Sequence, residues 1–204
     1  MSNSVSGNLR ALINEWVISA SCEQLRTWLD AGVFTGEVPI EVDMIFPQVH
    51  AELSTLVLRT LRKYKIPPSY LQLGLGESLL SHDMEQVSTV LHELHREGLA
   101  ITVDDFGTGC SSLAIMKTLP LAAVKIDGIF MRELVSPESD TAVIGAIVNL
   151  AHALALRVVA NGVQSAGQIQ ILENLGCDEC QGEFICAPLP ASAMEEKLRG
   201  AILH

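Results

Sequence analysis

Two adjacent carboxylates at the end of an expected strand are the residues in this chain best suited to chemistry. Residues 101–103 favour a strand and lead directly into Asp104 and Asp105. A glycine-spaced turn over 106–109 follows, and the serines at 111–112 predict the cap of a helix. Neighbouring aspartates at a strand end can hold divalent cations through hard oxygen ligands. The pattern alone leaves open a plainer interpretation, in which solvated acids precede a tight turn.

Read as a whole, this segment resembles the EAL family, the bacterial cyclic-di-GMP phosphodiesterases. The resemblance rests on Asp-Asp-Phe-Gly-Thr-Gly at 104–109, followed by Ser-Ser-Leu at 111–113. It extends over nearly the whole chain, from about residue 7 to residue 203. Further matches follow in the family's order and spacing: Leu-Pro at 119–120, Val-Lys-Ile-Asp at 124–127, Leu-Ala-His at 150–152, Gly-Cys-Asp-Glu at 176–179, Gln-Gly at 181–182 and Pro-Leu-Pro at 188–190.

Strands and helices alternate along the chain, which predicts parallel strands joined by right-handed crossovers. Most of the expected strands end in or next to a polar residue, as on the catalytic rim of a βα barrel. Periodicity yields six strands, whereas a closed barrel of this kind has about eight. We therefore expect an α/β fold, and the resemblance implies a (β/α)8 TIM-like barrel of EAL type that here lacks its first strands. The expected strands cover 38–44, 70–75, 100–105, 122–127, 157–160 and 177–181, and the main helices 8–30, 50–63, 87–97, 111–118, 139–154 and 166–175, with a last helix after 190.

The length and composition indicate a single domain over residues 1–204, with 49% apolar residues for its core, and the resemblance implies that this is a partial EAL domain. The Glu-Ala-Leu tripeptide that names the family is absent, so either the protein lacks that strand or the sequence was cut. A net charge of −11 argues against nucleic-acid binding but says little about a small anionic nucleotide. No apolar run suggests membrane insertion, and an odd number of cysteines, five, suggests the cytoplasm.

The resemblance implies a role for each residue that matches a family position. In the family, two metal ions activate a water that attacks a phosphodiester, helped by a lysine and a glutamate base. By motif position, the implied metal ligands are Asp104, Asp105 and Asp43, the last of which replaces an asparagine of the family. The implied catalytic remnants are Lys125 and Glu77, and the resemblance implies that Glu77 braces the loop after the aspartate pair. The implied nucleotide contacts are Gln181 and Pro188.

Several departures from the family pattern remove carboxylates from the expected site. Gly74 stands where the family has a metal-binding glutamate. Asn161 holds the position of the general base, and Gln164 replaces a second glutamate. Asparagine and glutamine stay neutral at any pH and cannot accept the proton. We therefore expect no bound cofactor in a degenerate member, and Mg²⁺ or Mn²⁺ only if the protein is active.

Two functions remain open at this point. The first is a catalytically degenerate EAL-domain protein in bacterial cyclic-di-GMP signalling, which acts through protein contact as a homodimer or with another protein. Whether it also binds cyclic-di-GMP as a receptor is left open. The alternative is an active, metal-dependent phosphodiesterase that hydrolyses cyclic-di-GMP to linear pGpG.

Overall fold

The computed structural model describes residues 2–44, 52–77, 84–108, 113–134 and 141–202. The chain forms two compact units, each described by itself. No helix in this part of the chain combines the length and the apolar character that a bilayer crossing requires. The single domain expected over residues 1–204 stays a prediction. The first unit comprises Met1–Gly74, Glu85–Ala100 and Leu189–His204, and the second comprises Leu75–Met84 and Ile101–Pro188.

Six strands are described, as the periodicity predicted, in the order β1-β2-β3-β4-β5-β6. Strands β3 to β6 pair in parallel, with Val103 opposite Val124 and Val124 opposite Val158. At least one helix separates each strand from the next along the chain, as a crossover between parallel strands requires. The strands are β1 (Ile40–Met44), β2 (Leu71–Gly76), β3 (Ala100–Phe106), β4 (Ala123–Ile126), β5 (Arg157–Asn161) and β6 (Glu179–Gln181).

Eight α-helices and one 3-10 helix are described, and two of them, the 3-10 helix and the short helix α5, were not predicted. The short helix α5 lacks a long apolar period, but Asp127 begins it by accepting a hydrogen bond from the Ile129 N–H at 2.6 Å. The helices are α1 (Ser2–Asp30), α2 (Glu52–Tyr64), the 3-10 helix η1 (Pro68–Tyr70), α3 (Met84–Arg96), α4 (Leu113–Thr118), α5 (Gly128–Glu133), α6 (Ala142–Ala153), α7 (Ala166–Asn174) and α8 (Ala191–Ile202). The serine caps expected at 111–112 lie outside the described residues.

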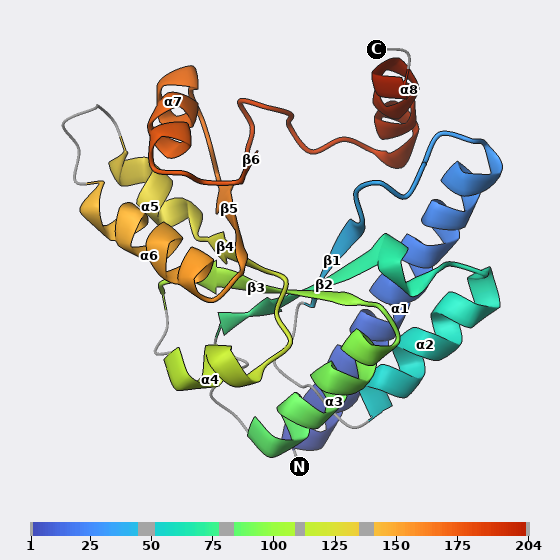
Figure 1. Cartoon of the computed structure of the whole chain (residues 1–204). Coiled ribbons are helices and arrows are strands. Elements are labelled where there is room, and N and C mark those ends of the chain that lie inside the picture. Colours follow the sequence, from blue (N-terminus) through green and yellow to red (C-terminus); the bar gives the residue numbers. More distant parts are fainter. Residues whose placement is uncertain (1, 45–51, 78–83, 109–112, 135–140, 203–204) are drawn as a thin grey trace. The chain divides into compact units, whose positions relative to one another are not determined.

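In the first unit, α1 packs against α2 and β1 (Figure 1). Its buried face carries Ile18, Cys22 and Leu25, which are fully buried and share one side of the helix. The Ser54 hydroxyl donates to Glu93 Oε2 at 2.7 Å and so ties α2 to α3. The buried residues of α1 thus form an apolar layer against β1.

The apolar residues near the start of α1 do not join this buried face. Leu9, Leu12 and Trp16 are apolar and belong to the same helix, but their exposed fractions are 59%, 61% and 69%. At 100° per residue, Leu9 and Trp16 lie about 180° and about 160° around the helix from Ile18. The spacing of these three residues therefore places them on other sides of the helix than Ile18.

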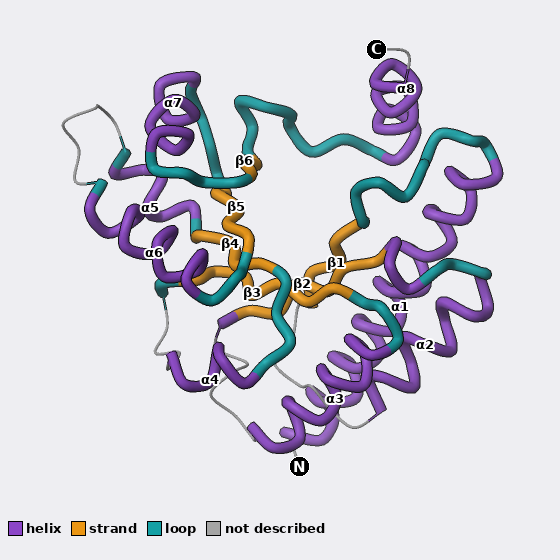
Figure 2. Tube along the Cα trace, in the orientation of Figure 1, coloured by secondary structure: helices purple, strands orange, loops and turns teal. Residues whose placement is uncertain are grey.

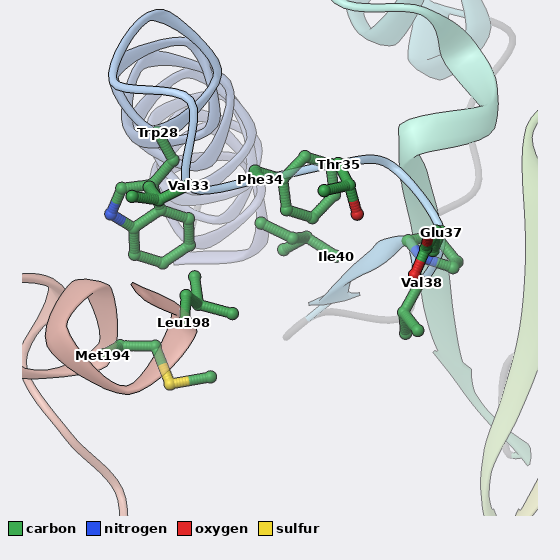
Figure 3. A pocket seen from close by; sticks show the side chains of 10 residues that line it. Trp28, Val33, Phe34, Thr35, Glu37, Val38, Ile40, Met194 and Leu198 are labelled. Atoms are coloured by element: carbon green, nitrogen blue, oxygen red, sulfur yellow. The ribbon is translucent and has the colours of Figure 1, made fainter. Parts of the chain in front are cut away.

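An apolar pocket of about 690 Å³ lies inside the first unit, between α1, β1 and α8 (Figure 3). Trp28, Ile40 and Leu198 line it from these three elements. Glu37 is the single charged residue among its described lining residues. The pocket therefore suits an apolar side chain or molecule better than acid–base chemistry.

In the second unit, neighbouring strands β3 to β5 form the apolar centre (Figure 2). Ile101, Val124, Ile126 and Val158 are fully buried there. All four residues of β4 are buried, as in a parallel sheet that is covered on both faces. This packing holds the ends of the strands, and with them the candidate site residues, in fixed register.

Candidate functional site

The two aspartates Asp104 and Asp105 lie at an irregular end of β3. The pairing of β3 with β4 shifts its register between Val103 and Phe106. Asp105 also adopts φ +56°, in the left-handed region that few non-glycine residues occupy. Strain of this kind persists only where the surrounding structure enforces it, and it gathers at functional sites. The irregularity breaks the simple alternation of the strand at the point where the two acids follow each other.

Asp104 forms a buried ion pair with the lysine of the neighbouring strand. Lys125 Nζ lies 3.1 Å from Asp104 Oδ1, and their side chains are only 6% and 14% exposed. A buried charge needs a partner of opposite sign, because desolvation penalises an isolated one. The structure thus brings together two of the predicted site residues. The ammonium group offsets the negative charge that Asp104 would otherwise offer to a cation.

Glu77 holds the turn that follows the aspartate pair. The buried Glu77 accepts a hydrogen bond from the Gly107 N–H through Oε2, at 3.0 Å. Gly107 has φ +97°, and a Cβ there would lie 2.9 Å from the Phe130 ring. The turn therefore requires glycine both for its backbone conformation and for the close approach of Phe130. This geometry suits a bracing role for Glu77.

Asn161 and Gln181 end the neighbouring strands β5 and β6. They are partners in the parallel register, and the Gln181 carbonyl accepts hydrogen bonds from the N–H groups of Gly162 and Val163 at 2.8 and 3.0 Å. The Gln181 residue is exposed, and Asn161 is half-buried. Pro188 is exposed in the segment between β6 and α8. Asn161, at the position that the resemblance implies for the general base, thus brings an uncharged amide to the strand end.

A buried glutamine fixes the turn after Asn161, and the sequence reasoning missed it. Gln168 Oε1 accepts from the Gln164 N–H at 2.7 Å, and Gln168 Nε2 donates to the Met131 carbonyl at 2.6 Å. The Ser165 hydroxyl in turn accepts from the Gln168 N–H at 3.3 Å and caps α7. A serine followed three residues later by glutamine is the sequence pattern of a capping box. That pattern could have identified Gln168 before the structure.

Asp43 belongs to the first unit, where a second acid lies beside it. Glu41 is two residues earlier on β1, and the carboxylates of Glu41 and Asp43 approach within 4.8 Å. Gln72 Nε2, on β2, donates to Glu41 Oε2 at 2.5 Å. Gly74, two residues after Gln72, contributes no side chain. Glu41 is a site residue that the sequence reasoning did not consider, although period-two alternation places it on the face of Asp43.

The cysteine pair near β6 has the character of a packed thiol pair. Burial raises the pKa of the Cys177 thiol to about 11, and burial also raises that of Cys180. In the described part of the chain, no group of three cysteine, histidine or carboxylate ligands gathers around these two thiols. Thiols that stay protonated at neutral pH are poor nucleophiles and poor metal ligands.

Comparison with known proteins decides the family. The sequence model of the EAL domain matches residues 5–188. The chain belongs to the EAL family. Its EAL domain is similar to the bifunctional diguanylate cyclase/cyclic di-GMP phosphodiesterase MucR of Pseudomonas aeruginosa, with 37% identity over 182 residues. It is also similar to the signaling protein YkoW of Bacillus subtilis, with 35% identity over 185 residues.

These matches cover 89% and 90% of the chain but only 26% and 23% of the two relatives. The chain therefore spans about a quarter of the length of these curated relatives.

Solved structures of EAL domains share the fold of this chain. A MucR phosphodiesterase in complex with c-di-GMP matches 95% of this chain and 78% of its own, with 36% identity and a TM-score of 0.86. The EAL domain of Mycobacterium smegmatis DcpA matches 94% of this chain and 86% of its own, with 30% identity and a TM-score of 0.86. These matches confirm the predicted fold class, an EAL-type βα barrel of which six strands are described here.

The contact between Glu77 and Gly107 predicts a measurable effect on stability. We expect Glu77→Ala to lower the free energy of unfolding by about 1.5–3 kcal/mol, because it leaves the Gly107 N–H without a charged acceptor. Glu77→Gln retains an acceptor oxygen and should lose less. Urea unfolding measures both changes, with the exposed Glu173→Ala, in the same unit, as a control that shifts by less than about 0.5 kcal/mol. Equal losses in Glu77→Ala and Glu173→Ala would contradict the bracing role.

Proposed function

We propose that this chain is a catalytically degenerate EAL domain that serves cyclic-di-GMP signalling through protein contacts and does not hydrolyse the nucleotide. The observation that carries the proposal is the shortage of carboxylates at the family's site positions. Gly74, Asn161 and Gln164 replace three acids that the resemblance implies. Asp104, one of the acids retained, already faces Lys125.

The magnitudes of these losses favour inactivity. Removal of a general base typically costs about 10²–10⁴ in rate. Without bound cations, the attacking water also keeps a pKa of about 16 instead of about 7. The amides of Asn161 and Gln164 cannot compensate, because they hold no titratable group. Lys125 is buried beside Asp104 and supplies no base while protonated.

The retained residues do not fit the pair of cations that the family uses. Two neighbouring dications repel each other unless several carboxylates neutralise them. In the second unit, the ammonium group of Lys125 lies 3.1 Å from Asp104 and opposes a further positive charge there. We therefore derive no reaction step through a metal pair in this chain.

The alternative is an active cyclic-di-GMP phosphodiesterase. It is favoured by the 37% identity to MucR, a protein named as a cyclic di-GMP phosphodiesterase. The second acid beside Asp43 also favours it, because Glu41 returns one negative charge to the first unit. In this alternative the cations would be Mg²⁺ or Mn²⁺, and a segment outside this sequence would complete the site.

Nucleotide binding without hydrolysis is a further role within the proposal. The MucR structure named as a c-di-GMP complex matches 95% of this chain. Gln181 anchors the turn after β5 through its carbonyl, which leaves its exposed side chain available for a ligand. Pro188 lies exposed farther along the same segment.

Protein contact is supported by apolar surface in the first unit. Val38 is 71% exposed and lines the apolar pocket beside Ile40 (Figure 3). A second copy of this chain that covers Val38 would remove this apolar surface from water. The proposal includes such a homodimer, and it includes a cytoplasmic location, which the odd number of cysteines supports.

An activity assay tests the absence of hydrolysis. We expect no linear pGpG when the chain is incubated with cyclic-di-GMP and Mg²⁺ or Mn²⁺, because base and ligands are missing. The EAL domain of MucR serves as the positive control. Turnover by this chain that disappears in Asp105→Asn would contradict the proposal and support the phosphodiesterase alternative. Calorimetry with the nucleotide and Ca²⁺ then separates the remaining roles: a saturable heat lost in Gln181→Ala assigns a receptor, and no heat assigns protein contact alone.

The contact surface around Val38 is tested by sedimentation velocity. We expect the chain to sediment as a dimer at tens of micromolar, and Val38→Asp to sediment as a monomer, because a buried carboxylate without a partner is costly. Val143→Asp, on the exposed face of α6 in the second unit, is the matched control and should remain dimeric. A wild-type monomer, or a dimer that survives Val38→Asp, would contradict this part of the proposal.

A further inference from the structure

The two ends of the apolar pocket in the first unit differ in chemistry (Figure 3). Trp28, Met194 and Leu198 lie at one end, where the six-membered ring of Trp28 points toward Leu198. Glu37 and Val38 lie at the other end. One end is therefore apolar, whereas the other carries the single charged residue among the described lining residues. Such a pocket matches a molecule that has one apolar end and one polar end.

The loop after α1 forms a fixed wall of this pocket. Gly32, at φ +67°, ends the helix and allows the Val33 N–H to donate to the Trp28 carbonyl at 3.0 Å. The turn buries Val33, which is only 2% exposed. The next residue, Phe34, packs edge-on against Tyr70, with 5.6 Å between the ring centroids. A wall that is already packed loses little conformational entropy when a ligand binds, which favours affinity.

Helix α8 forms another wall, and its apolar side chains there remain partly in water. Met194 and Leu198 are four residues apart and therefore share one face of the helix. Met194 is 37% exposed and Leu198 is half-buried, although both line the pocket. A molecule inside the pocket would remove this apolar surface from water, and that burial would favour its binding.

We propose that this pocket binds a small amphiphilic cation, a molecule with an apolar body and one protonated amino group. The volume of the pocket, about 690 Å³, lies within the range of about 300–1,000 Å³ that is typical of small-molecule sites. The apolar body would contact Trp28 and Leu198, and the amino group would lie near Glu37 at the other end. A chain with a net charge of −11 also attracts cations and repels anionic amphiphiles such as fatty acids.

The inference is independent of nucleotide hydrolysis and of the proposed homodimer. Every described lining residue belongs to the first unit of one chain. None of these residues is among the predicted metal ligands, catalytic residues or nucleotide contacts of the candidate site. Cyclic-di-GMP is an anion, so it does not suit an apolar pocket whose charged residue is a carboxylate. The probes are therefore simple amphiphiles, without nucleotide or metal.

Tryptophan fluorescence of the whole chain tests the proposal. The chain has two tryptophans, and Trp16 is exposed outside the pocket, so Trp16→Phe leaves Trp28 as the reporter inside it. Octylamine, octanol and octanoate share one apolar body but carry a positive charge, no charge and a negative charge at neutral pH. We expect octylamine to change the Trp28 emission saturably, with half-saturation at about 1 mM or below. It should bind more tightly than octanol, and octanol more tightly than octanoate.

Two substitutions separate the apolar contact from the charge. Leu198→Gln should weaken octylamine and octanol binding by about tenfold, because it removes an apolar wall. Its matched control is Leu9→Gln, at an exposed position of α1 outside the pocket, which should leave binding unchanged. Glu37→Gln should weaken octylamine by about threefold at low salt and leave octanol unchanged. Glu52→Gln, exposed at the start of α2, is the control for this loss of charge.

Circular dichroism verifies that each variant folds, and Met194→Gln, on the same wall, replaces Leu198→Gln if that variant does not fold. An emission change that saturates with none of the three probes, or that is unaltered in the folded wall variant, would overturn the inference of a binding site. Octanoate binding as tight as octylamine binding would overturn the assignment of a cation. Each of these results leaves the proposed lack of hydrolysis and the contact at Val38 standing, because the activity assay and sedimentation test them without amphiphiles.

Discussion

The compensation of buried charge is the constraint on which the candidate site depends. Lys125 and Asp104 lie 3.1 Å apart on neighbouring strands, almost entirely shielded from water. Neither could stay charged there alone without a large desolvation penalty. The pair therefore fixes the ends of β3 and β4 electrostatically, while the buried apolar residues of these strands fix their register. A site built on this pair begins with a carboxylate whose charge is already balanced.

The site positions at and after the end of β5, Asn161 and Gln164, add no negative charge that would need a partner. Asn161 and Gln164 bring amides to the end of β5, where they are held by backbone contacts to Gln181 and Gln168. These contacts preserve the shape of the rim without its negative charge. The chain thus keeps the fold of its family, and on the proposal made above it has lost most of the groups that would bind cations and accept a proton. In this fold, strand packing determines the shape of the site, whereas a few side chains at the strand ends determine its chemistry. The chemistry can therefore change while the shape is kept.

Much of the fold could be predicted from the sequence, because it depends on periodic burial. The spacing of apolar residues predicted the buried faces of α2 and α3, and the apolar runs of β3 to β5 predicted these strands. The exposure of the start of α1 was not predicted in this way, because Leu9, Leu12 and Trp16 have nearly helical spacing but do not share the face of Ile18. The helix α5 was also missed, since six residues begun by one capping carboxylate carry too little periodic signal.

The parts of the candidate site that lie within one short motif could be predicted from the sequence. The parts that form between distant strands could not. The Asp104-Asp105 turn and Lys125 follow from short motifs, but the left-handed conformation of Asp105 and the ion pair require the structure. Glu41 was missed because the hydrogen bond that it accepts joins it to Gln72, which lies 31 residues away along the chain. Long-range pairing of this kind leaves no mark in one sequence.

Manganese-edge anomalous diffraction from a crystal soaked with Mn²⁺ and cyclic-di-GMP would test the central claim, the shortage of carboxylates, most directly. The account predicts no pair of manganese ions at the strand ends, because too few carboxylates are present there to hold two dications. Two fully ligated manganese ions per chain, with Asp104 and Asp105 among their ligands, would contradict it.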